Sequence, residues 1–207
     1  MLTIGLTGQS GAGKGEFSRI FKRRDGVYHL DTDITAREVV EKGEPCLKEL
    51  CDYFGDEILL SDGGLDRKKL ASIAFTDEEK HKKLNEITHF YITERIKKWL
   101  SDVKKEGALV AIIDAPLLFE SGADALCDIT IGVTAPYATR LRRIMKRDGI
   151  DKKNAKIRLD SQPNDEFFEQ RCSYTLANNG TLSALEKKAA LLIDSILSQH
   201  LSERQQS

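Results

Sequence analysis

The chain has 207 residues, of which 31% are charged, and its formal net charge at pH 7 is −1. This length fits one α/β domain with an insertion, or two small domains that share a core. The balanced charge excludes a general nucleic-acid binder, and no window of the sequence is long and apolar enough to span a membrane, so we expect an unexported cytoplasmic protein.

The cysteines indicate neither a disulfide framework nor a zinc site. Cys46, Cys51, Cys127 and Cys172 form no Cys-x-x-Cys pair and have no histidine at a spacing typical of zinc ligands. We therefore expect free thiols, which persist in a reducing cytoplasm. The chain also has no internal repeat and no low-complexity segment.

A glycine-rich turn lies between the first predicted strand and the first predicted helix. Residues 2–6 form a short apolar run that is typical of a buried strand, and residues 8–15 read Gly-Gln-Ser-Gly-Ala-Gly-Lys-Gly. Residues 16–23 then place their apolar side chains on one helical face. In this context Gly-x-x-x-x-Gly-Lys predicts a phosphate site, in which loop N–H groups, the helix N-terminus and Lys14 bind the anion. A glycine-rich turn without a ligand is the alternative.

The residue after Lys14 departs from this pattern. A serine or threonine hydroxyl usually binds magnesium there, whereas this chain has Gly15 followed by Glu16. The phosphate cradle consists of backbone and survives the change. No direct metal ligand is assigned. Glu16 or Asp33 is a candidate for a metal contact through water, and Asp114 is a candidate for a further oxygen around the metal's waters.

Two carboxylates follow the second predicted strand. Residues 27–30 read as a strand that ends in Asp31-Thr32-Asp33, and residues 34–40 read as a helix. Ligands bind beyond the carboxyl ends of the strands in open α/β sheets, so these carboxylates are placed for chemistry. Helix capping is the alternative role for each of them.

Residues 43–107 are mostly helical in pattern and are more than a crossover between two strands needs. The predicted helices span residues 46–54, 65–75 and 80–105, and a capping box starts at Thr76. We expect this insertion to form a small lobe that binds a second substrate.

Three further strands are predicted in the second half of the chain. Residues 109–113 form the most strand-like run and end in Asp114, and residues 128–133 form the next strand. The fifth strand is predicted at 172–176, before a closing amphipathic helix at 183–201. The residues after that helix are expected to be a frayed tail.

An arginine-rich helix is predicted at 137–146, and Asp151 caps a shorter helix after it. Arg140, Arg143 and Arg147 are three and four residues apart, so they share one face. A run of charges often marks only a solvated face. Phosphoryl transfer, however, needs cations around the transferred group, so we expect at least one of these arginines to act in it.

Together these motifs resemble the dephospho-CoA kinase family, from residue 4 to about residue 185. The segments that carry the resemblance are 8–14, 31–33, 36–40, 54–55, 62–63, 65–67, 84–89, 116–120, 140–141, 147–148, 158 with 162, and 178–180. The glycine-rich loop is common to P-loop proteins, whereas Pro-Leu-Leu-Phe-Glu together with Asp-x-Asp and Leu-Asp-Arg is more specific. The chain departs from the family at Gly15, at Phe90 and at Cys172-Ser173.

The resemblance implies transfer of the γ-phosphoryl group of ATP to the ribose 3′-hydroxyl of dephospho-CoA, with Mg²⁺. It implies that Asp33 is the general base and that Lys14 and Arg140 also act in catalysis. The implied ATP contacts are Gly11, Ala12, Gly13, Lys14, Gly15, Glu16, Arg147 and Asn178. The implied dephospho-CoA contacts are Asp33, Arg37, Asn85, His89 and Phe119. Arg140 and Arg147 would belong to a lid that closes over the nucleotide and excludes water.

We therefore expect a three-layer α/β fold of the P-loop kinase type, with a five-stranded parallel sheet. Its expected parts are a core of residues 1–42, 108–135 and 171–203, a helical CoA-substrate lobe of 43–107 and a lid of 136–170. A monomer is favoured, with a small molecule as its partner and neither nucleic acid nor membrane. Two alternatives stay open: a kinase for a nucleoside monophosphate, and a nucleotide-binding protein that has lost catalysis, which Gly15 and Glu16 would favour.

Overall fold

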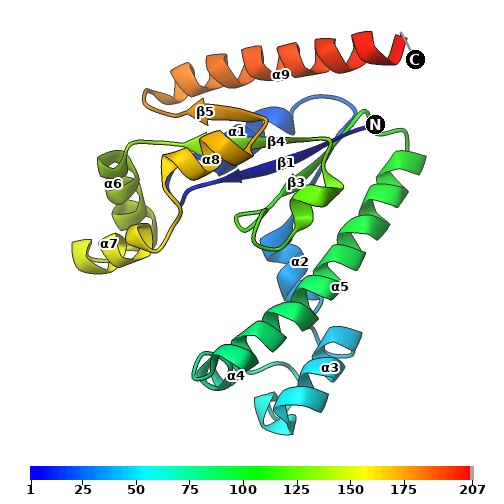
Figure 1. Ribbon diagram of the computed structural model, residues 1–207, viewed down its shortest axis with the longest axis vertical. Coiled ribbons are helices and arrows are strands. Elements are labelled where there is room, and N and C mark those ends of the chain that lie inside the picture. Colours follow the sequence, from blue (N-terminus) through cyan, green and yellow to red (C-terminus); the bar gives the residue numbers. More distant parts are fainter. Residues whose placement is uncertain (206–207) are drawn as a thin grey trace. The chain divides into compact units, whose positions relative to one another are not determined.

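The computed structural model describes residues 1–205, which form two compact units (Figure 1). The first unit comprises Met1–His29 and the chain from Val103 onward, and the second comprises Leu30–Asp102. The second unit begins earlier than the expected lobe, because Val39 and Val40 are buried in its core. Within residues 1–205, no helix combines the length and the apolarity that a membrane crossing requires.

The first unit is built on a five-stranded sheet of order β2-β3-β1-β4-β5. The strands are β1 (Leu2–Gly8), β2 (Val27–Asp31), β3 (Val110–Asp114), β4 (Ile129–Thr134) and β5 (Tyr174–Ala177). The central strand β1 pairs in parallel with both β3 and β4, with Ile4 opposite Ile112 on one side and Leu6 opposite Ile131 on the other. The prediction of an α/β fold with a five-stranded parallel sheet is confirmed.

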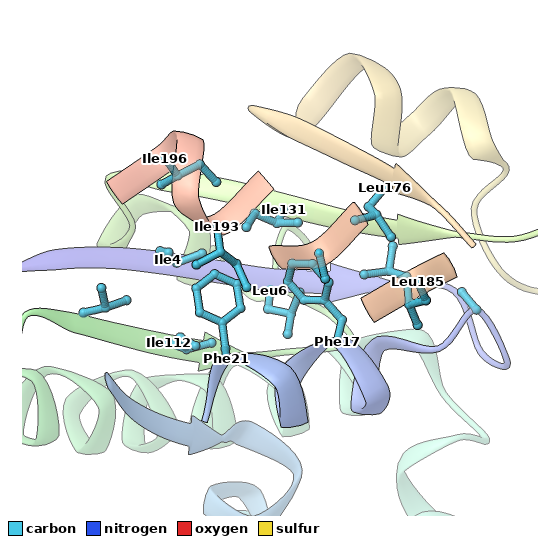
Figure 2. Close-up of a cluster of buried hydrophobic side chains, with 14 of the residues drawn as sticks. Ile4, Leu6, Phe17, Phe21, Ile112, Ile131, Leu176, Leu185, Ile193 and Ile196 are labelled. Carbon is cyan, nitrogen blue, oxygen red and sulfur yellow. The ribbon is translucent and has the colours of Figure 1, made fainter. Parts of the chain in front are cut away.

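One face of the sheet is covered by α1 (Lys14–Phe21) and α9 (Leu182–Gln205), as Figure 2 shows. Phe17 and Phe21 of α1 pack edge to face and are at most 1% exposed. Together with Ile193 and other apolar residues of α9 they cover Ile4 and Leu6 of β1. Burial of side chains of this size contributes about 1.5–3 kcal/mol each, so this cluster anchors the strand that leads into the glycine-rich loop.

The opposite face uses glycines for close packing. A Cβ at Gly5 of β1 would lie 2.8 Å from both Leu118 Cδ2 and Cys127 Sγ. On β4, a Cβ at Gly132 would lie 2.9 Å from Cys172 Sγ, close to Phe168 of α8 (Asp165–Arg171). Successive side chains of β1 point to opposite faces of the sheet. The large residues Ile4 and Leu6 therefore pack on α1 and α9, and Gly5 allows Leu118 and Cys127 to pack closely on the other face.

The order of the strands puts a topological switch point between β1 and β3, and ligands of open α/β sheets bind in the crevice at such a point. The chain leaves β1 toward β2 and leaves β3 toward β4, which lies on the other side of β1. Right-handed crossovers in opposite directions put the following segments on opposite faces, so the carboxyl ends of β1 and β3 flank an opening. Lys14 follows β1, and Asp114 ends β3.

Two helices, α6 (Tyr137–Asp148) and α7 (Lys152–Asp160), extend beyond the carboxyl ends of the strands (Figure 1). Asp151 caps α7 by accepting a hydrogen bond from the Asn154 N–H. Ile144, Ala155 and Leu159 form a small buried cluster between the two helices. A short 3₁₀ helix, η2 (Ala123–Leu126), precedes β4.

The second unit is helical. Its elements are α2 (Thr32–Glu38), α3 (Pro45–Phe54), η1 (Asp56–Ile58), α4 (Arg67–Ala74) and α5 (Glu78–Lys105), whose last residues belong to the first unit. Leu50, Ile58 and Ile87 lie in its buried core, which draws on several of these helices. The unit thus has an apolar core of its own.

Four boundary predictions need correction. Asp31 caps α2 through the Asp33 N–H, so that helix starts at Thr32 rather than at residue 34. The predicted capping box at Thr76 is wrong, because Asp77 accepts from the Glu79 N–H while Thr76 Oγ1 donates to the Ile73 carbonyl.

Strand β5 starts at Tyr174 instead of residue 172. Just before it, the Ser173 N–H donates to Thr130 Oγ1 and the Thr130 N–H donates to Ser173 Oγ, so side-chain hydroxyls replace the ladder bonds there. The amide of Cys172 caps α8 by donating to the Phe168 carbonyl. Helix α9 continues to Gln205, so the predicted frayed tail is wrong for residues 202–205, and residues 206–207 lie outside the described chain.

Candidate active site

The glycine-rich loop between β1 and α1 has a conformation that only glycine tolerates at two positions. Gly11 and Gly13 have φ angles of 78° and 109°. A Cβ on Gly13 would also collide with the side-chain amide of Asn178. Gly13 directly precedes the first residue of α1, so the loop leads straight into the N-terminus of that helix, where anions bind. This is the backbone arrangement of a phosphate site.

The loop carbonyls are held by two side chains from elsewhere in the first unit. Arg143 Nη1 donates to the carbonyls of Gly11 and Ala12, each at 3.1 Å, and Asn178 Nδ2 donates to the Ala12 carbonyl at 2.7 Å. Within the loop, the Ala12 N–H donates to the Gln9 carbonyl at 3.0 Å and the Glu16 N–H donates to the Gly13 carbonyl at 3.1 Å, so the loop is also held by bonds of its own backbone. Asn178 is a predicted nucleotide contact, and in the structure its side-chain amide is bonded to the loop carbonyl of Ala12.

We expect Arg143→Ala to lower kcat/KM for ATP by about 10-fold, because a hydrogen bond from a charged group contributes about 1.5–3 kcal/mol. Arg142→Ala is the matched control, since Arg142 is exposed on the same helix. Steady-state kinetics of both variants measure the difference. Equal activity of the two variants would mean that the Arg143 contact does not shape the loop.

Lys14 and Asp114 meet at the crevice between β1 and β3. Lys14 Nζ forms an ion pair with Asp114 Oδ1, and His29 Nε2 lies 3.1 Å from Asp114 Oδ2. Burial alone would raise the pKa of the Asp114 carboxyl, but the hydrogen bond from His29 and the positive charge of Lys14 outweigh burial and hold this pKa below its ordinary value. An ionised carboxylate therefore faces the lysine of the phosphate loop.

Of the predicted lid arginines, Arg140 is buried and Arg147 is exposed. Arg140 is 6% exposed, its Nε donates to the Ala135 carbonyl, and burial lowers its pKa. Arg147 forms a two-pronged pair with Asp148, whose carboxylate also accepts from Arg158 Nη1. The Arg140 side chain is thus buried in the structure, whereas the Arg147 side chain lies on the exposed surface of α6.

The segment between α7 and α8 is tied to the glycine-rich loop. Gln162 Oε1 accepts from the Ser10 N–H at 2.9 Å, and Gln9 Nε2 donates to the Pro163 carbonyl at 3.0 Å. Movements of the expected lid would therefore be transmitted to the start of the loop. Sequence spacing gave no indication of these contacts.

Gly15 and Glu16 lie on the exposed side of α1. A Cβ at Gly15 would meet no atom within 4 Å, and the Glu16 carboxylate forms an ion pair with Arg19 one turn along the helix. The predicted water-mediated metal contact of Glu16 would have to compete with this pair. Asp114 is the more deeply buried carboxylate.

In the second unit, the two carboxylates after β2 differ in their contacts. Asp31 Oδ1 accepts from the Asp33 N–H at 2.9 Å as the cap of α2. The Asp33 side chain is in the exposed first turn and has no hydrogen-bonding partner in the described part of the chain. Arg37 lies one turn further along α2, and it is also exposed.

Two further predicted substrate contacts lie on α5. Asn85 and His89 are one turn apart, and Asn85 Nδ2 is 3.4 Å from His81 Nε2. Burial lowers the pKa of His89, which favours its neutral form.

A cavity of about 530 Å³ also opens in the second unit, but none of the predicted contacts lines it. Its lining residues are Gly43, Glu44, Pro45, Leu47, Lys48, Cys51, Asp52, Asp56, Leu59 and Gly63.

Phe119 belongs to an aromatic cluster of the first unit. Its ring packs edge to face on Phe167 with 5.8 Å between centroids, and the Arg171 guanidinium lies over both rings. Phe167 and Arg171 belong to α8, a helix that was not among the predicted elements.

The sequence contains a start signal for α8 that could have revealed it. Asn164 caps the helix by accepting from the Phe167 N–H, and acidic residues follow in the first turn.

Comparisons with known proteins agree on one family. A sequence model described as dephospho-CoA kinase matches residues 2–184. A dephospho-CoA kinase of Corynebacterium glutamicum is 39% identical over 199 residues, which cover 96% of this chain and 99% of that protein. One of Lactobacillus johnsonii is 36% identical over 193 residues, which cover 93% and 97%.

Solved structures show the same similarity. A dephospho-CoA kinase from Campylobacter jejuni superposes with a TM-score of 0.71 at 26% identity, covering 96% of this chain and 98% of that one. A shikimate kinase from Acinetobacter baumannii has a TM-score of 0.53 at 16% identity and covers 96% and 94%, which shows a shared fold only.

Proposed function

The chain belongs to the dephospho-CoA kinase family, and we propose that it transfers the γ-phosphoryl group of ATP to the ribose 3′-hydroxyl of dephospho-CoA, giving coenzyme A and ADP. The observation that carries this proposal is the contact of Lys14 with Asp114 at the end of a phosphate loop. Family membership favours this reaction over a nucleoside monophosphate kinase and over a binding protein without catalysis.

We assign the ATP phosphates to the loop amides from Gly11 to Glu16 and to Lys14. The left-handed glycines and the start of α1 support this assignment, because glycine-rich turns and helix N-termini are the backbone features that bind phosphate. Arg143 and Asn178 hold the loop in shape from behind. Positioning and charge stabilisation of this kind supply most of the catalysis in phosphoryl transfer.

We assign dephospho-CoA to the second unit, with Arg37, Asn85 and His89 as contacts, and to Phe119 of the first unit. Asp33 would orient the ribose 3′-hydroxyl and accept its proton. The exposed Asp33 carboxylate, which has no hydrogen-bonding partner in residues 1–205, supports this role. Asp31 is occupied as a helix cap and is the weaker candidate.

We assign residues 136–170 to a lid that excludes water when ATP is bound. Arg147 and Arg158 share Asp148, so release of this carboxylate would free both guanidinium groups for phosphate. Arg140 keeps its predicted catalytic role only if lid closure exposes its side chain, since that side chain is buried and its Nε donates to the Ala135 carbonyl.

The residues fit a magnesium ion that is carried in with ATP. No cluster of three or more His, Cys, Asp and Glu side chains suited to a metal is found within the described residues. Mg²⁺ at such sites usually keeps several waters and takes only a carboxylate or two besides phosphate oxygens. The Asp114 carboxylate fits this role, and Glu16 is paired with Arg19. When bound, the ion neutralises charge on the β- and γ-phosphate oxygens.

Gly15→Ser is expected to lower the Mg²⁺ concentration for half-maximal activity by about 3–10-fold, the equivalent of one added hydrogen bond. The Cβ of the new side chain meets no atom within 4 Å, and serine supplies the hydroxyl of the usual P-loop. Gly15→Ala is the matched control, because it adds the Cβ without the hydroxyl. Identical Mg²⁺ titrations of the two variants would show that the hydroxyl has no role in this chain.

A coupled assay of ADP release tests the function, with ATP, Mg²⁺ and dephospho-CoA, beside AMP and CMP as acceptors. Turnover with dephospho-CoA alone is the expected result. Turnover with AMP or CMP instead would identify a nucleoside monophosphate kinase. ATP binding without turnover of any acceptor would identify a nucleotide-dependent binder.

We also propose that the protein is a monomer of the reducing cytoplasm. The free thiols Cys46, Cys51, Cys127 and Cys172 support the compartment. Light scattering coupled to size-exclusion chromatography measures the oligomeric state.

A further inference from the structure

A histidine lies in the polar interior behind the phosphate loop. His29 projects from β2, and its side chain is 7% exposed. Its Nε2 lies 2.6 Å from Ser18 Oγ of α1 and 3.1 Å from Asp114 Oδ2 of β3. An aliphatic residue at this strand position would need no partners, whereas a buried imidazole is costly unless it is hydrogen-bonded. The contacts made by His29 therefore call for a functional explanation.

The role of His29 Nε2 depends on the tautomer of the ring. An ionised carboxylate only accepts hydrogen bonds, so the tautomer with a proton on Nε2 is the one that donates to Asp114 Oδ2. The two Asp114 oxygens are then held from opposite sides, Oδ2 by His29 and Oδ1 by Lys14.

These two contacts have different fates in the proposed reaction. Lys14 is assigned to the ATP phosphates, so its contact with Asp114 weakens when ATP binds. The contact with His29 comes from β2 and uses the other carboxylate oxygen, Oδ2, so it does not depend on Lys14. His29 therefore still holds Asp114 in the ATP-bound protein.

The absence of a hydroxyl at position 15 raises the importance of this orientation. In the usual P-loop, a Ser or Thr hydroxyl and a carboxylate at the end of a strand hold magnesium together. Here Gly15 supplies no oxygen, and Asp114 is the carboxylate beside Lys14. We propose, on the basis of the proposed function, that His29 is a positioning residue that orients Asp114 toward the magnesium–ATP complex and so compensates for Gly15.

The test is the Mg²⁺ dependence of ATP binding, measured by calorimetry without an acceptor. For His29→Leu we expect the Mg²⁺ concentration for half-maximal enhancement of ATP binding to rise about 10-fold or more, as is typical when a partner that orients a metal ligand is lost. ATP affinity without Mg²⁺ should stay as in the wild type. His29→Gln, which keeps an N–H donor, should recover part of the loss.

Two further variants separate positioning from packing. Adding Gly15→Ser to His29→Leu should restore much of the Mg²⁺ response, because the new hydroxyl replaces the contact that depends on Asp114. Ser18→Ala removes the other partner of His29 and should change the Mg²⁺ response less than His29→Leu does. If His29→Leu fails to fold, His29→Gln with and without Gly15→Ser gives the same comparison.

Wild-type Mg²⁺ dependence in folded His29→Leu would overturn the proposal. An equal loss of ATP affinity with and without Mg²⁺ would also overturn it, since that result indicates a packing role. Failure of the wild-type protein to phosphorylate dephospho-CoA would contradict the proposed function alone, because the binding measurement does not require turnover.

Discussion

Asp33→Asn is expected to lower kcat with dephospho-CoA by about 100-fold or more, as loss of a positioned general base predicts. Asparagine keeps the size and the hydrogen-bonding reach of the side chain but cannot accept the hydroxyl proton at neutral pH. ATP affinity should change little, because the ATP phosphates are assigned to the loop amides and Lys14, whereas the Asp33 carboxylate is assigned to the acceptor hydroxyl. The coupled assay gives kcat, and calorimetry gives ATP affinity.

Asp31→Asn is the matched control for Asp33→Asn. Asparagine is as good a helix cap as aspartate, so the hydrogen bond to the Asp33 N–H should survive. We expect kcat close to that of the wild type. An equal loss in both variants would assign the effect to the carboxylate pair, and no loss in Asp33→Asn would exclude it as the base.

The phosphate loop and the Asp-x-Asp segment could be predicted because their chemistry is local. Strand, glycine-rich turn and helix follow one another within residues 2–21, and each part has its own sequence signal. The end of β2 at Asp31 could be predicted in the same way, because the apolar run and the carboxylate that ends it are adjacent in sequence. The five-stranded sheet could be predicted because its apolar runs are short and are separated by helical segments.

The groups that hold the loop could not be predicted, because they meet it only through the fold. Arg143 contacts Gly11 across more than a hundred residues, and nothing in the helical spacing distinguishes it from Arg140. His29 resembles an ordinary strand residue until β3 brings Asp114 beside it. Sequence patterns define a helical face, but tertiary packing decides which side chain on that face reaches the site.

Lys14→Met is expected to reduce kcat by about 100–1,000-fold, the range seen when a single preorganised charge-stabilising group is removed. The Lys14 ammonium reaches the phosphates as a point charge and is lost in this variant, whereas methionine matches much of its length. KM for ATP should also rise, since the ground state carries the same phosphates. The coupled assay measures both constants.

The ion pair adds a second expected consequence of Lys14→Met. Asp114 is 4% exposed and would keep His29 as its partner but lose Lys14. A buried charged group that loses a partner costs about 1–3 kcal/mol, so we expect the free energy of unfolding in urea to fall by that amount. Lys14→Arg keeps a positive charge and should retain most of the stability while losing activity, because a planar guanidinium does not fit a site for a compact ammonium.

The Lys14→Met, Asp114→Asn double variant distinguishes the two effects. Neutralising Asp114 removes the buried charge that Lys14→Met leaves behind, so stability should recover relative to the single variant. Activity should stay low, because Lys14 acts on ATP and not only on Asp114. Recovery of activity together with stability would mean that Lys14 serves mainly to neutralise Asp114, and the phosphates would then depend on the loop amides and α1 alone.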